Sequence, residues 1–403
     1  MEQEVQLTTL AVGSNRRPIV VFAVGILCFW AAMYVYVPIF SVYAEKLGAS
    51  MGIVGLGVGV YGLTQMLTRV PIGIGSDALG RRRGIVVAGM FICALAAAGL
   101  ALAPSPQWLV VFRGVMGFAA ATWVCSTVLF TSYFQKTDPA VPLSIMSLMS
   151  ALGQVVGTSS GGVLAETFGW TMPFWVSMGL SLVAAAVLLV PPEDATARPV
   201  TVTKESMWRI VKAPLLLLSC GVGIIVYFAT FSTVYGFTPV LAEKMGASRT
   251  ELGFLTTGAL GAYSVLTILT PRLCKILGER NTLLFGLGAT TLGILPTPWV
   301  DSLTPLFVLQ VFSGIGRGVL YPLMMSLSIK AVAPPDRASA MGIFQAAYAF
   351  GMFIGPWISG ILADMSGLPS VYILCGGLCL ACLVICIPIT TRGAMRTAFL
   401  KTA

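Results

Sequence analysis

A heptapeptide occurs twice in this chain of 403 residues, and the two copies lie almost half a chain length apart. The copies read AEKLGAS at 44–50 and AEKMGAS at 242–248. Other landmarks keep the same displacement, among them Glu166 with Asp364. Because self-similarity at a fixed offset indicates duplicated structural units, the chain is predicted to consist of two halves of similar plan, related by pseudo-symmetry.

Long apolar stretches fill both halves. Apolar residues make up 57% of the chain and charged residues only 10%, whereas soluble domains carry roughly 25% charged residues. A stretch of about 20 apolar residues can cross the hydrocarbon core of a bilayer, and its backbone must be paired internally, so each is expected to be a helix. Twelve spans are predicted: 18–43, 51–74, 84–103, 107–133, 140–165, 171–191, 213–241, 250–271, 281–300, 304–332, 338–363 and 369–390.

The predicted fold class is an all-α membrane protein with twelve transmembrane helices in two pseudo-symmetric six-helix bundles. The first bundle is expected over 1–191, and the second, with a cytoplasmic tail, over 213–403. A polar stretch rich in proline, 192–212, separates them and is predicted to be a cytoplasmic linker.

Basic residues are concentrated in alternate loops between the spans. With a cytoplasmic N-terminus, most of the 24 Lys and Arg residues fall inside, and only Lys46, Lys244 and Arg249 are found outside. This bias follows the positive-inside rule, so both termini are predicted to be cytoplasmic, with the protein in the plasma (inner) membrane. Topology also accounts for the net charge of +9, so no nucleic-acid partner is expected.

The loop after the second span carries glycines, an aspartate and basic residues at a characteristic spacing. They are Gly73, Asp77, Gly80, Arg81 and Arg82. This pattern, in this loop, resembles the loop signature of the major facilitator superfamily. The resemblance extends over both halves and is closest to the drug and metabolite exporter branch. It implies a secondary transporter that moves a small organic molecule by alternating access, with these loop residues as a cytoplasmic latch between the bundles.

Glycines spaced by four residues mark the fifth and eleventh spans, in a pattern that resembles the antiporter motif of the same superfamily. Such glycines give a smooth helix face that allows close packing. We therefore expect these two spans to be sliding contacts between the bundles. The residues are Gly153, Gly157 and Gly161 in the fifth span and Gly351, Gly355 and Pro356 in the eleventh.

Two arginines lie deep in predicted spans, Arg113 in the fourth and Arg317 in the tenth, while Arg69 lies near the inner end of the second. Inserting an arginine costs roughly 2.5–3.5 kcal/mol, so it should face a cavity or a partner. The resemblance places spans 1, 4, 7 and 10 around the cavity, and a guanidinium suits carboxylate, phosphate or sulfonate. Arg113 and Arg317 are therefore expected to bind an anionic substrate. The alternative is that helix carbonyls hold Arg113 and backbone near a glycine-rich bend caps Arg317.

No carboxylate falls deep within a predicted span, and the chain contains no histidine. A proton-coupled exporter normally uses a titratable group at membrane depth. Coupling therefore stays open between substrate exchange, uniport, a proton carried by the substrate, and an acid at a helix end such as Asp77 or Glu251.

Aromatic and amide side chains on the expected lining helices favour a partly apolar ligand. The preferred substrate contacts are Tyr34, Trp123, Tyr321 and Gln345, because they lie well inside their spans. The cysteines are interpreted as packing residues, and neither a metal nor a cofactor is expected. No nucleophile–base pair or phosphate loop stands out, so the chain is not expected to be an enzyme.

The predicted function is transport of an anionic or amphipathic small molecule by an exporter-like protein, a monomer in the lipid bilayer. Two alternatives on the same fold stay open. One is a lipid or lysolipid flippase, and the other is proton-coupled multidrug efflux.

Overall fold

The protein is almost entirely helical. The computed structural model describes residues 16–134, 140–193, 210–330, 332–333 and 336–391. The first half contains α2 (Arg16–Tyr34), α3 (Val37–Lys46), α4 (Met51–Leu79), α5 (Arg83–Ala101), α6 (Pro106–Ala121), α7 (Trp123–Ser132), α8 (Ala140–Phe168) and α9 (Met172–Leu188). The second half contains α11 (Pro214–Ser232), the π-helix η1 (Thr233–Phe237), α12 (Thr238–Lys244), α13 (Arg249–Ile294), the 3₁₀ turn η2 (Thr297–Trp299), α14 (Leu303–Lys330), α15 (Arg337–Ser366) and α16 (Leu368–Ile389).

The helices fit the predicted membrane spans. Among the described residues, 10 helical segments are long and apolar enough to cross a membrane, and Met172–Leu188 is a shorter apolar helix. The segment Arg249–Trp299 has 51 residues, which at ~1.5 Å per residue is roughly twice what one span requires. Gly278 interrupts it with φ 76° and ψ 155°, values that glycine tolerates best. Two spans therefore lie in this segment, consistent with the predicted twelve-span fold.

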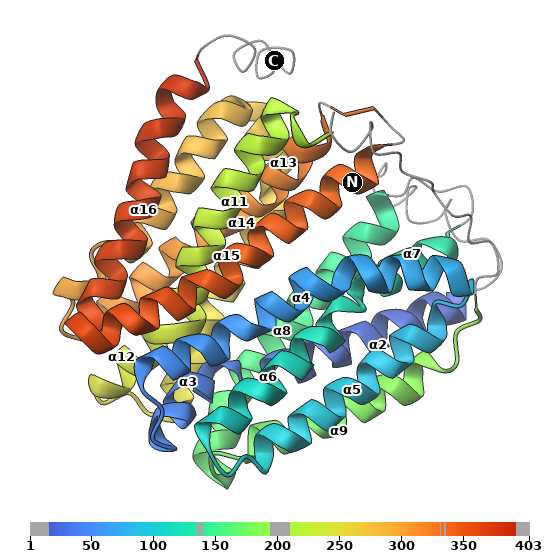
Figure 1. Cartoon of the computed structure of the whole chain (residues 1–403), viewed down its shortest axis with the longest axis horizontal. Helices are drawn as coiled ribbons and strands as arrows, with labels where there is room; N and C mark the ends of the chain where they lie inside the picture. Colours follow the sequence, from blue (N-terminus) through green and yellow to red (C-terminus); the bar gives the residue numbers. More distant parts are fainter. Residues whose placement is uncertain (1–15, 135–139, 194–209, 331, 334–335, 392–403) are drawn as a thin grey trace, which may run out of the picture.

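The helices of each half pack mainly with one another (Figure 1), and two pairs of helices form the most extensive contacts between the halves. These pairs are α4 with α15 and α8 with α13. We refer to the two groups as the first bundle, up to α9, and the second bundle, from α11. The predicted linker, 192–212, lies largely outside the described residues.

The first helix of each bundle is broken at a proline. Pro38 follows the break between α2 and α3, and Pro239 follows the π-helical turn between α11 and α12. Proline has no N–H and its ring clashes with the carbonyl four residues earlier, so the helix cannot continue regularly. In the second bundle that carbonyl belongs to Tyr235, and it accepts a hydrogen bond from Ser41 Oγ of the first bundle at 3.2 Å. The breaks thereby place Tyr36 and Tyr235 at the centre of the molecule.

The glycine-spaced spans contact the opposite bundle, but the predicted glycines face their own bundle. An added Cβ at Gly157 would lie 2.6 Å from Ala31 O of α2, and one at Gly355 would lie 2.6 Å from Phe228 O of α11. Residues four apart share one helix face, so all glycines of one stripe contact the same neighbour. The remaining predicted glycines also contact their own bundle, Gly153 at α2, Gly161 at Val35 directly after α2, and Gly351 at α11. The two spans do contact the opposite bundle as expected, but through other residues, such as Pro356 and Gly162, and not through these glycines.

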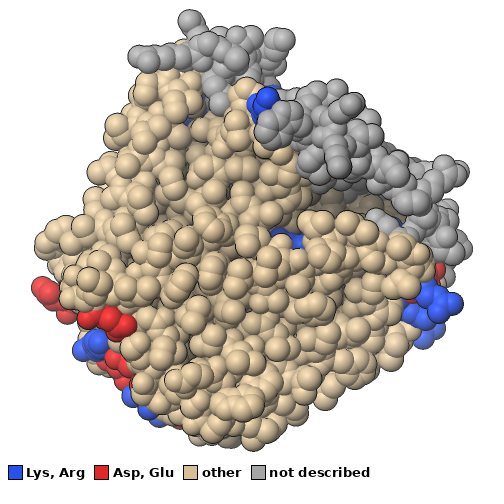
Figure 2. Space-filling view, viewed as in Figure 1, with Lys and Arg blue, Asp and Glu red and all other residues tan. Residues whose placement is uncertain are grey.

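The outer surface of the bundles is apolar. Large side chains such as Ile74, Leu95 and Ile276 are 66%, 65% and 78% exposed. In Figure 2 the broad face between the ends carries almost no charged atoms, and acidic and basic side chains gather at the lower left and at the right. An exposed apolar surface of this extent suits lipid rather than water.

Candidate functional site

The two copies of the heptapeptide meet at one end of the molecule, which we call the closed end. Lys46 Nζ lies 2.8 Å from Glu243 Oε1, and Lys244 Nζ lies 3.4 Å from Glu45 Oε1. Each pair joins one bundle to the other, so the repeat forms a reciprocal clamp. The side chains are partly exposed, and exposed ion pairs contribute only about 0.2–1 kcal/mol each.

Two more carboxylates cross between the bundles at the closed end. Asp364, near the end of α15, accepts hydrogen bonds of 2.8 Å from both Met51 N and Gly52 N at the start of α4. Glu166, near the end of α8, accepts one of 2.8 Å from Arg249 N at the start of α13. Unpaired N–H groups and the helix dipole favour negative charge there. Because Glu166 and Asp364 are equivalent in the repeat, the two caps are pseudo-symmetric.

We expect Asp364→Asn to weaken the closed end by roughly 1 kcal/mol, because the amide loses the charge that two helical N–H groups stabilise. Spin labels at Phe168→Cys and Met365→Cys, exposed at the closed ends of α8 and α15, would report a larger share of long distances in a background without native cysteines. Glu166→Gln is the matched variant and should act in the same direction. Unchanged distances in both variants would show that the caps do not hold this end together.

Glycines let the bundles touch backbone to backbone near the closed end. A Cβ added to Gly55 of α4 would lie 2.0 Å from Pro356 O of α15, and one added to Gly162 of α8 would lie 2.4 Å from Arg249 O of α13. No side chain fits at those distances without a backbone shift. The closed end therefore depends on glycine at these interface positions.

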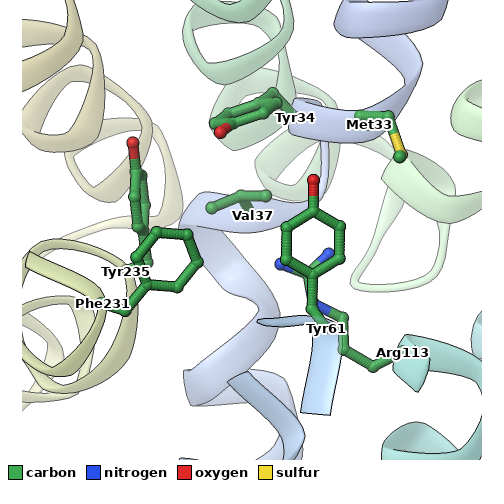
Figure 3. A pocket seen from close by; sticks show the side chains of 7 residues that line it. All are labelled: Met33, Tyr34, Val37, Tyr61, Arg113, Phe231 and Tyr235. Carbon is green, nitrogen blue, oxygen red and sulfur yellow. The ribbon is translucent and has the colours of Figure 1, made fainter. Parts of the chain in front are cut away.

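A small cavity lies between the bundles beneath the closed end. The space at its centre is about 10 Å³, enough for about one water molecule. Figure 3 shows Val37 and Tyr34 between Phe231 and Tyr235 on one side and Tyr61 with the Arg113 guanidinium on the other. The lining residues are Met33, Tyr34, Val37, Tyr61, Arg113, Phe231 and Tyr235.

Arg113 of α6 is held by aromatic side chains in the first bundle. It is 5% exposed, and its Nη1 donates a hydrogen bond to Tyr36 Oη. The guanidinium carbon lies 4.4 Å from the centroid of the Tyr61 ring and 5.5 Å from that of Phe40, which are cation–π distances. Its Nε is buried without a hydrogen-bond partner. The alternative considered for Arg113, in which helix carbonyls hold its guanidinium, is thus not what the structure shows.

Arg317 of α14 has an equivalent environment in the second bundle. It is 5% exposed, and its Nη1 donates to Tyr235 Oη at 2.5 Å. Its guanidinium carbon lies 4.2 Å from the centroid of the Tyr263 ring. In both bundles the arginine comes from the fourth span, the phenol from the break in the first span, and the stacked ring from the second span. The two arginine sites are therefore copies of one arrangement.

Arg69 of α4 joins the bundles further from the closed end. Its Nη1 donates to Gln345 Oε1 at 2.7 Å and to Tyr348 Oη at 2.8 Å, both on α15. Its Nη2 donates to Gln65 Oε1 at 2.5 Å. These three acceptors are neutral, and Nε is buried without a partner. The sequence placed Arg69 at the inner end of its span and did not select it.

Positive charge collects at the centre of the molecule without acidic partners. Within the described part of the chain, Arg69, Arg113 and Arg317 form no ion pair with a carboxylate, in contrast to Lys46, Lys244 and Lys330. A buried charge without a counter-ion is costly. The centre can therefore stabilise an anion, with aromatic rings around it for an apolar group.

Of the four predicted substrate contacts, Tyr34 lines the small cavity, and the other three do not. Gln345 binds Arg69. Trp123 packs edge-on against Trp30 with centroids 5.2 Å apart, and Tyr321 packs on Tyr348 at 6.1 Å.

The contacts described for the predicted latch residues are with their own bundle. The N–H groups of Arg82 and Arg83 donate to Glu193 Oε1 at 2.7 and 3.0 Å, and Gly80 ends α4 with φ +60°, which favours glycine. A Cβ at Gly73 would meet only Val124 of α7, at 3.9 Å. Arg81 is exposed, and the side chain of Asp77 lies outside the described part of the structure.

Three functional candidates escaped sequence reasoning, namely Tyr61, Tyr263 and Arg69. Tyr61 and Tyr263 both lie in the second span of their half, but the repeat places Ala259 opposite Tyr61 and Gln65 opposite Tyr263, so a comparison of the halves by position would not have paired them. Arg69 had no signal in the repeat either, because the second half has no arginine at the matching place.

The chain is similar to known transporters over most of its length. The family model for the Major Facilitator Superfamily matches residues 22–248 and 220–401. A multi-drug resistance efflux pump PmrA homolog of Lactococcus lactis is 25% identical, covering 85% of this chain and 87% of its own. The multidrug resistance protein MdtH of Aeromonas salmonicida is 27% identical, covering 82% and 84%.

A solved structure shares the fold at low sequence identity. It is a bacterial homolog of the human lysosomal transporter Spinster in an inward-facing and unoccupied conformation, with a TM-score of 0.77, 17% identity, and coverage of 97% of this chain and 99% of the other. The family match and these relatives are those of membrane transporters and not of enzymes. The chain therefore belongs to the Major Facilitator Superfamily, as a multi-pass membrane transporter.

Proposed function

We propose that this transporter exports a small amphipathic organic anion by alternating access. The observation that carries the proposal is the central group of three arginines, which the described residues supply only with neutral acceptors. A guanidinium donates two parallel hydrogen bonds to a carboxylate or sulfonate, so an anion from solution would complete the charge balance. Arg113 and Arg317 approach from opposite bundles and are assigned as the main substrate contacts.

Aromatic rings favour an apolar group beside the anionic one. Tyr34 packs on Tyr235 with centroids 6.1 Å apart, and Phe231 stacks on Tyr61 at 6.5 Å. These pairs bring rings of both bundles around the cavity. Rings provide dispersion contact and a polar edge, which suits a planar or aromatic anion better than a sugar. Tyr34, Trp123, Tyr321 and Gln345 remain in the proposed site.

The closed end is assigned to the outer face of the plasma membrane. The basic residues Arg81, Arg82, Arg83, Lys212, Arg280 and Lys330 lie at the opposite end of the helices. The positive-inside rule places that end, with both termini, in the cytoplasm. The structure then represents a state closed to the outside, and the bundles 1–191 and 213–403 are the moving units of a monomer, joined by the linker.

The latch is assigned to the other state of the cycle. In the described state, Glu193 accepts hydrogen bonds from the backbone N–H groups of Arg82 and Arg83 within the first bundle. When the closed end opens and the cytoplasmic end closes, Gly73, Asp77, Gly80, Arg81 and Arg82 would face the second bundle and hold it.

The direction of transport is inferred from the relatives, and its energy coupling from the residues at the centre. The relatives described as efflux and multidrug resistance proteins favour export. The central residues described include no carboxylate beside the arginines, which favours exchange or a proton carried by the substrate over a buried acidic carrier.

The proposal is tested with three compounds that share one ring system: 1-naphthoate, 1-naphthamide and 1-naphthylmethylammonium. We expect only the carboxylate to raise the melting temperature of the purified protein, because a ligand that binds the native state stabilises it. Proteoliposomes loaded with 1-naphthoate should then take up the labelled anion by counterflow. Stabilisation and uptake of the ammonium compound instead would overturn the proposal and favour multidrug efflux of cations.

One observation favours lysolipid transport as the second candidate. A groove of about 290 Å³ opens between α13 and α14 near the closed end, lined by Glu251, Phe254, Leu255, Leu303, Thr304 and Phe307. The phenylalanine and leucine side chains of this groove could contact an acyl chain. The same melting assay with a lysolipid distinguishes the two candidates. Only the flippase hypothesis predicts that lysolipid stabilises the protein more than 1-naphthoate does.

A further inference from the structure

Arg69 is surrounded by neutral hydrogen-bond acceptors. Three oxygens contact its guanidinium, from Gln65, Gln345 and Tyr348, and all are neutral. One terminal nitrogen, Nη1, serves two of these acceptors, and the buried Nε serves none. A guanidinium has five N–H donors in a planar fork, so this arrangement uses its bonding capacity poorly. A carboxylate would match the fork better.

The position of Arg69 makes it reachable. It is partly exposed, in contrast to Arg113 and Arg317, which are each 5% exposed. At Gly62, an added Cβ would still touch Met352 of α15 at 2.6 Å. Arg69 lies seven residues beyond Gly62, which at ~1.5 Å per residue places it about 10 Å further from the closed end. Further along α4, a Cβ at Gly73 would meet only α7 of its own bundle. Arg69 thus lies where α4 and α15 separate.

Aromatic rings form a wall beside Arg69. Its guanidinium carbon lies 5.7 Å from the centroid of Tyr348. Tyr348 stacks on Tyr227 with centroids 4.5 Å apart and an interplanar angle of 20°, and Tyr321 packs edge-on against both rings at 6.1 Å. Phe231 then stacks on Tyr227 at 6.1 Å and also lines the central cavity. A continuous row of rings therefore connects Arg69 with the cavity.

We propose that Arg69 is a second anion-binding subsite, which takes the acidic group of a planar aromatic carboxylate before it reaches Arg113 and Arg317. This inference rests on the proposed function. In the state described here, Gln345 Oε1 and Tyr348 Oη occupy the positions of the carboxylate oxygens. The ring of the ligand would lie on the row formed by Tyr348, Tyr227 and Phe231.

Occupation of this subsite has a consequence for the bundles. The two hydrogen bonds that Arg69 makes to α15 are bonds between bundles. An anion that replaces them removes these bonds from the interface between α4 and α15. The subsite therefore couples entry of the substrate to loosening of the bundle contact at this level.

The decisive measurement is the number of 1-naphthoate molecules bound per purified protein, by equilibrium dialysis with labelled ligand. We expect two sites in the wild type, one in Arg69→Gln and one in Arg317→Gln. A wild type that binds one anion, lost in Arg317→Gln and kept in Arg69→Gln, would overturn the second subsite and leave the proposed function standing. A wild type that binds no anion would overturn both.

Tyr348→Phe separates a binding role from a structural one. It keeps the stacked ring but removes one oxygen that competes with the ligand for Nη1. Because a net hydrogen bond is worth about 0.5–1.5 kcal/mol, affinity at the second subsite should rise by about 2- to 10-fold. If Arg69 only holds the bundles together, the variant would leave the affinity unchanged or lower it, which would contradict the proposal. Neutral 1-naphthamide is the matched ligand control, and its affinity should not rise in the Tyr348→Phe variant.

Discussion

Arg317→Gln is expected to lower the transport of 1-naphthoate in proteoliposomes by about 100-fold, while the protein still folds. Loss of one partner of a desolvated charge pair costs about 2–5 kcal/mol, and each 1.4 kcal/mol is about tenfold in affinity. Glutamine keeps a polar side chain of medium length but removes the charge and the forked donors. Folding should survive, because in the described structure Arg317 makes its side-chain hydrogen bond to the phenol of Tyr235, and no ion pair with a carboxylate is broken.

Three variants identify the origin of the loss. Arg317→Lys keeps the charge without the fork and should retain intermediate activity. Arg113→Gln is the pseudo-symmetric counterpart and should also reduce transport strongly. Arg272→Gln, at an exposed position of α13, controls for the loss of one positive charge and should transport like the wild type. Wild-type transport by well-folded Arg317→Gln would remove this residue from the substrate site.

The sequence repeat predicted more of the structure than any other feature. It predicted two similar halves, and its heptapeptide turned out to supply the clamp of Glu45, Lys46, Glu243 and Lys244. The partnership between the copies was not predictable. A repeat shows that two segments are alike, but it does not show that they meet, since contact depends on how the bundles tilt in the state described.

The depth of the arginines was predictable and their partners were not. Hydropathy placed Arg113 and Arg317 inside their spans, because charged residues stand out in apolar sequence. The phenols of Tyr36 and Tyr235 reach these arginines only because Pro38 and Pro239 break the first helix of each bundle. That effect is a property of the broken helix in three dimensions, and distance along the span does not reveal it.

Arg69 shows where counting along a span fails. The sequence placed it near the inner end of the second span and indicated no partner, yet it contacts Gln345 and Tyr348 of the other bundle. The angle at which α4 and α15 cross determines which residues meet, and sequence spacing does not determine that angle. The same limit explains why the sequence did not reveal which helix the glycine stripes contact.

Gly55→Ala is expected to reduce transport by about 5- to 150-fold by disfavouring the closed end. The new Cβ would lie 2.0 Å from Pro356 O, a backbone atom that cannot turn away as a side chain can. Overpacking of this kind costs typically about 1–3 kcal/mol, which changes the ratio of two conformations by about 5- to 150-fold. Every transport cycle must pass through the closed-end state, so the loss of that state limits turnover even when the binding site is intact.

Two further glycine-to-alanine variants of α4 distinguish this steric effect from a general effect of alanine in the helix. Gly59→Ala would place a Cβ 2.4 Å from Phe353 O and should behave like Gly55→Ala, whereas Gly75→Ala meets nothing within 4 Å and should behave like the wild type. The spin-label pair Phe168→Cys and Met365→Cys should show longer distances in the first two variants only. Because the arginines are untouched, equilibrium binding of 1-naphthoate should persist while transport falls. Short distances and full transport in Gly55→Ala would mean that turnover does not require the close contact between α4 and α15.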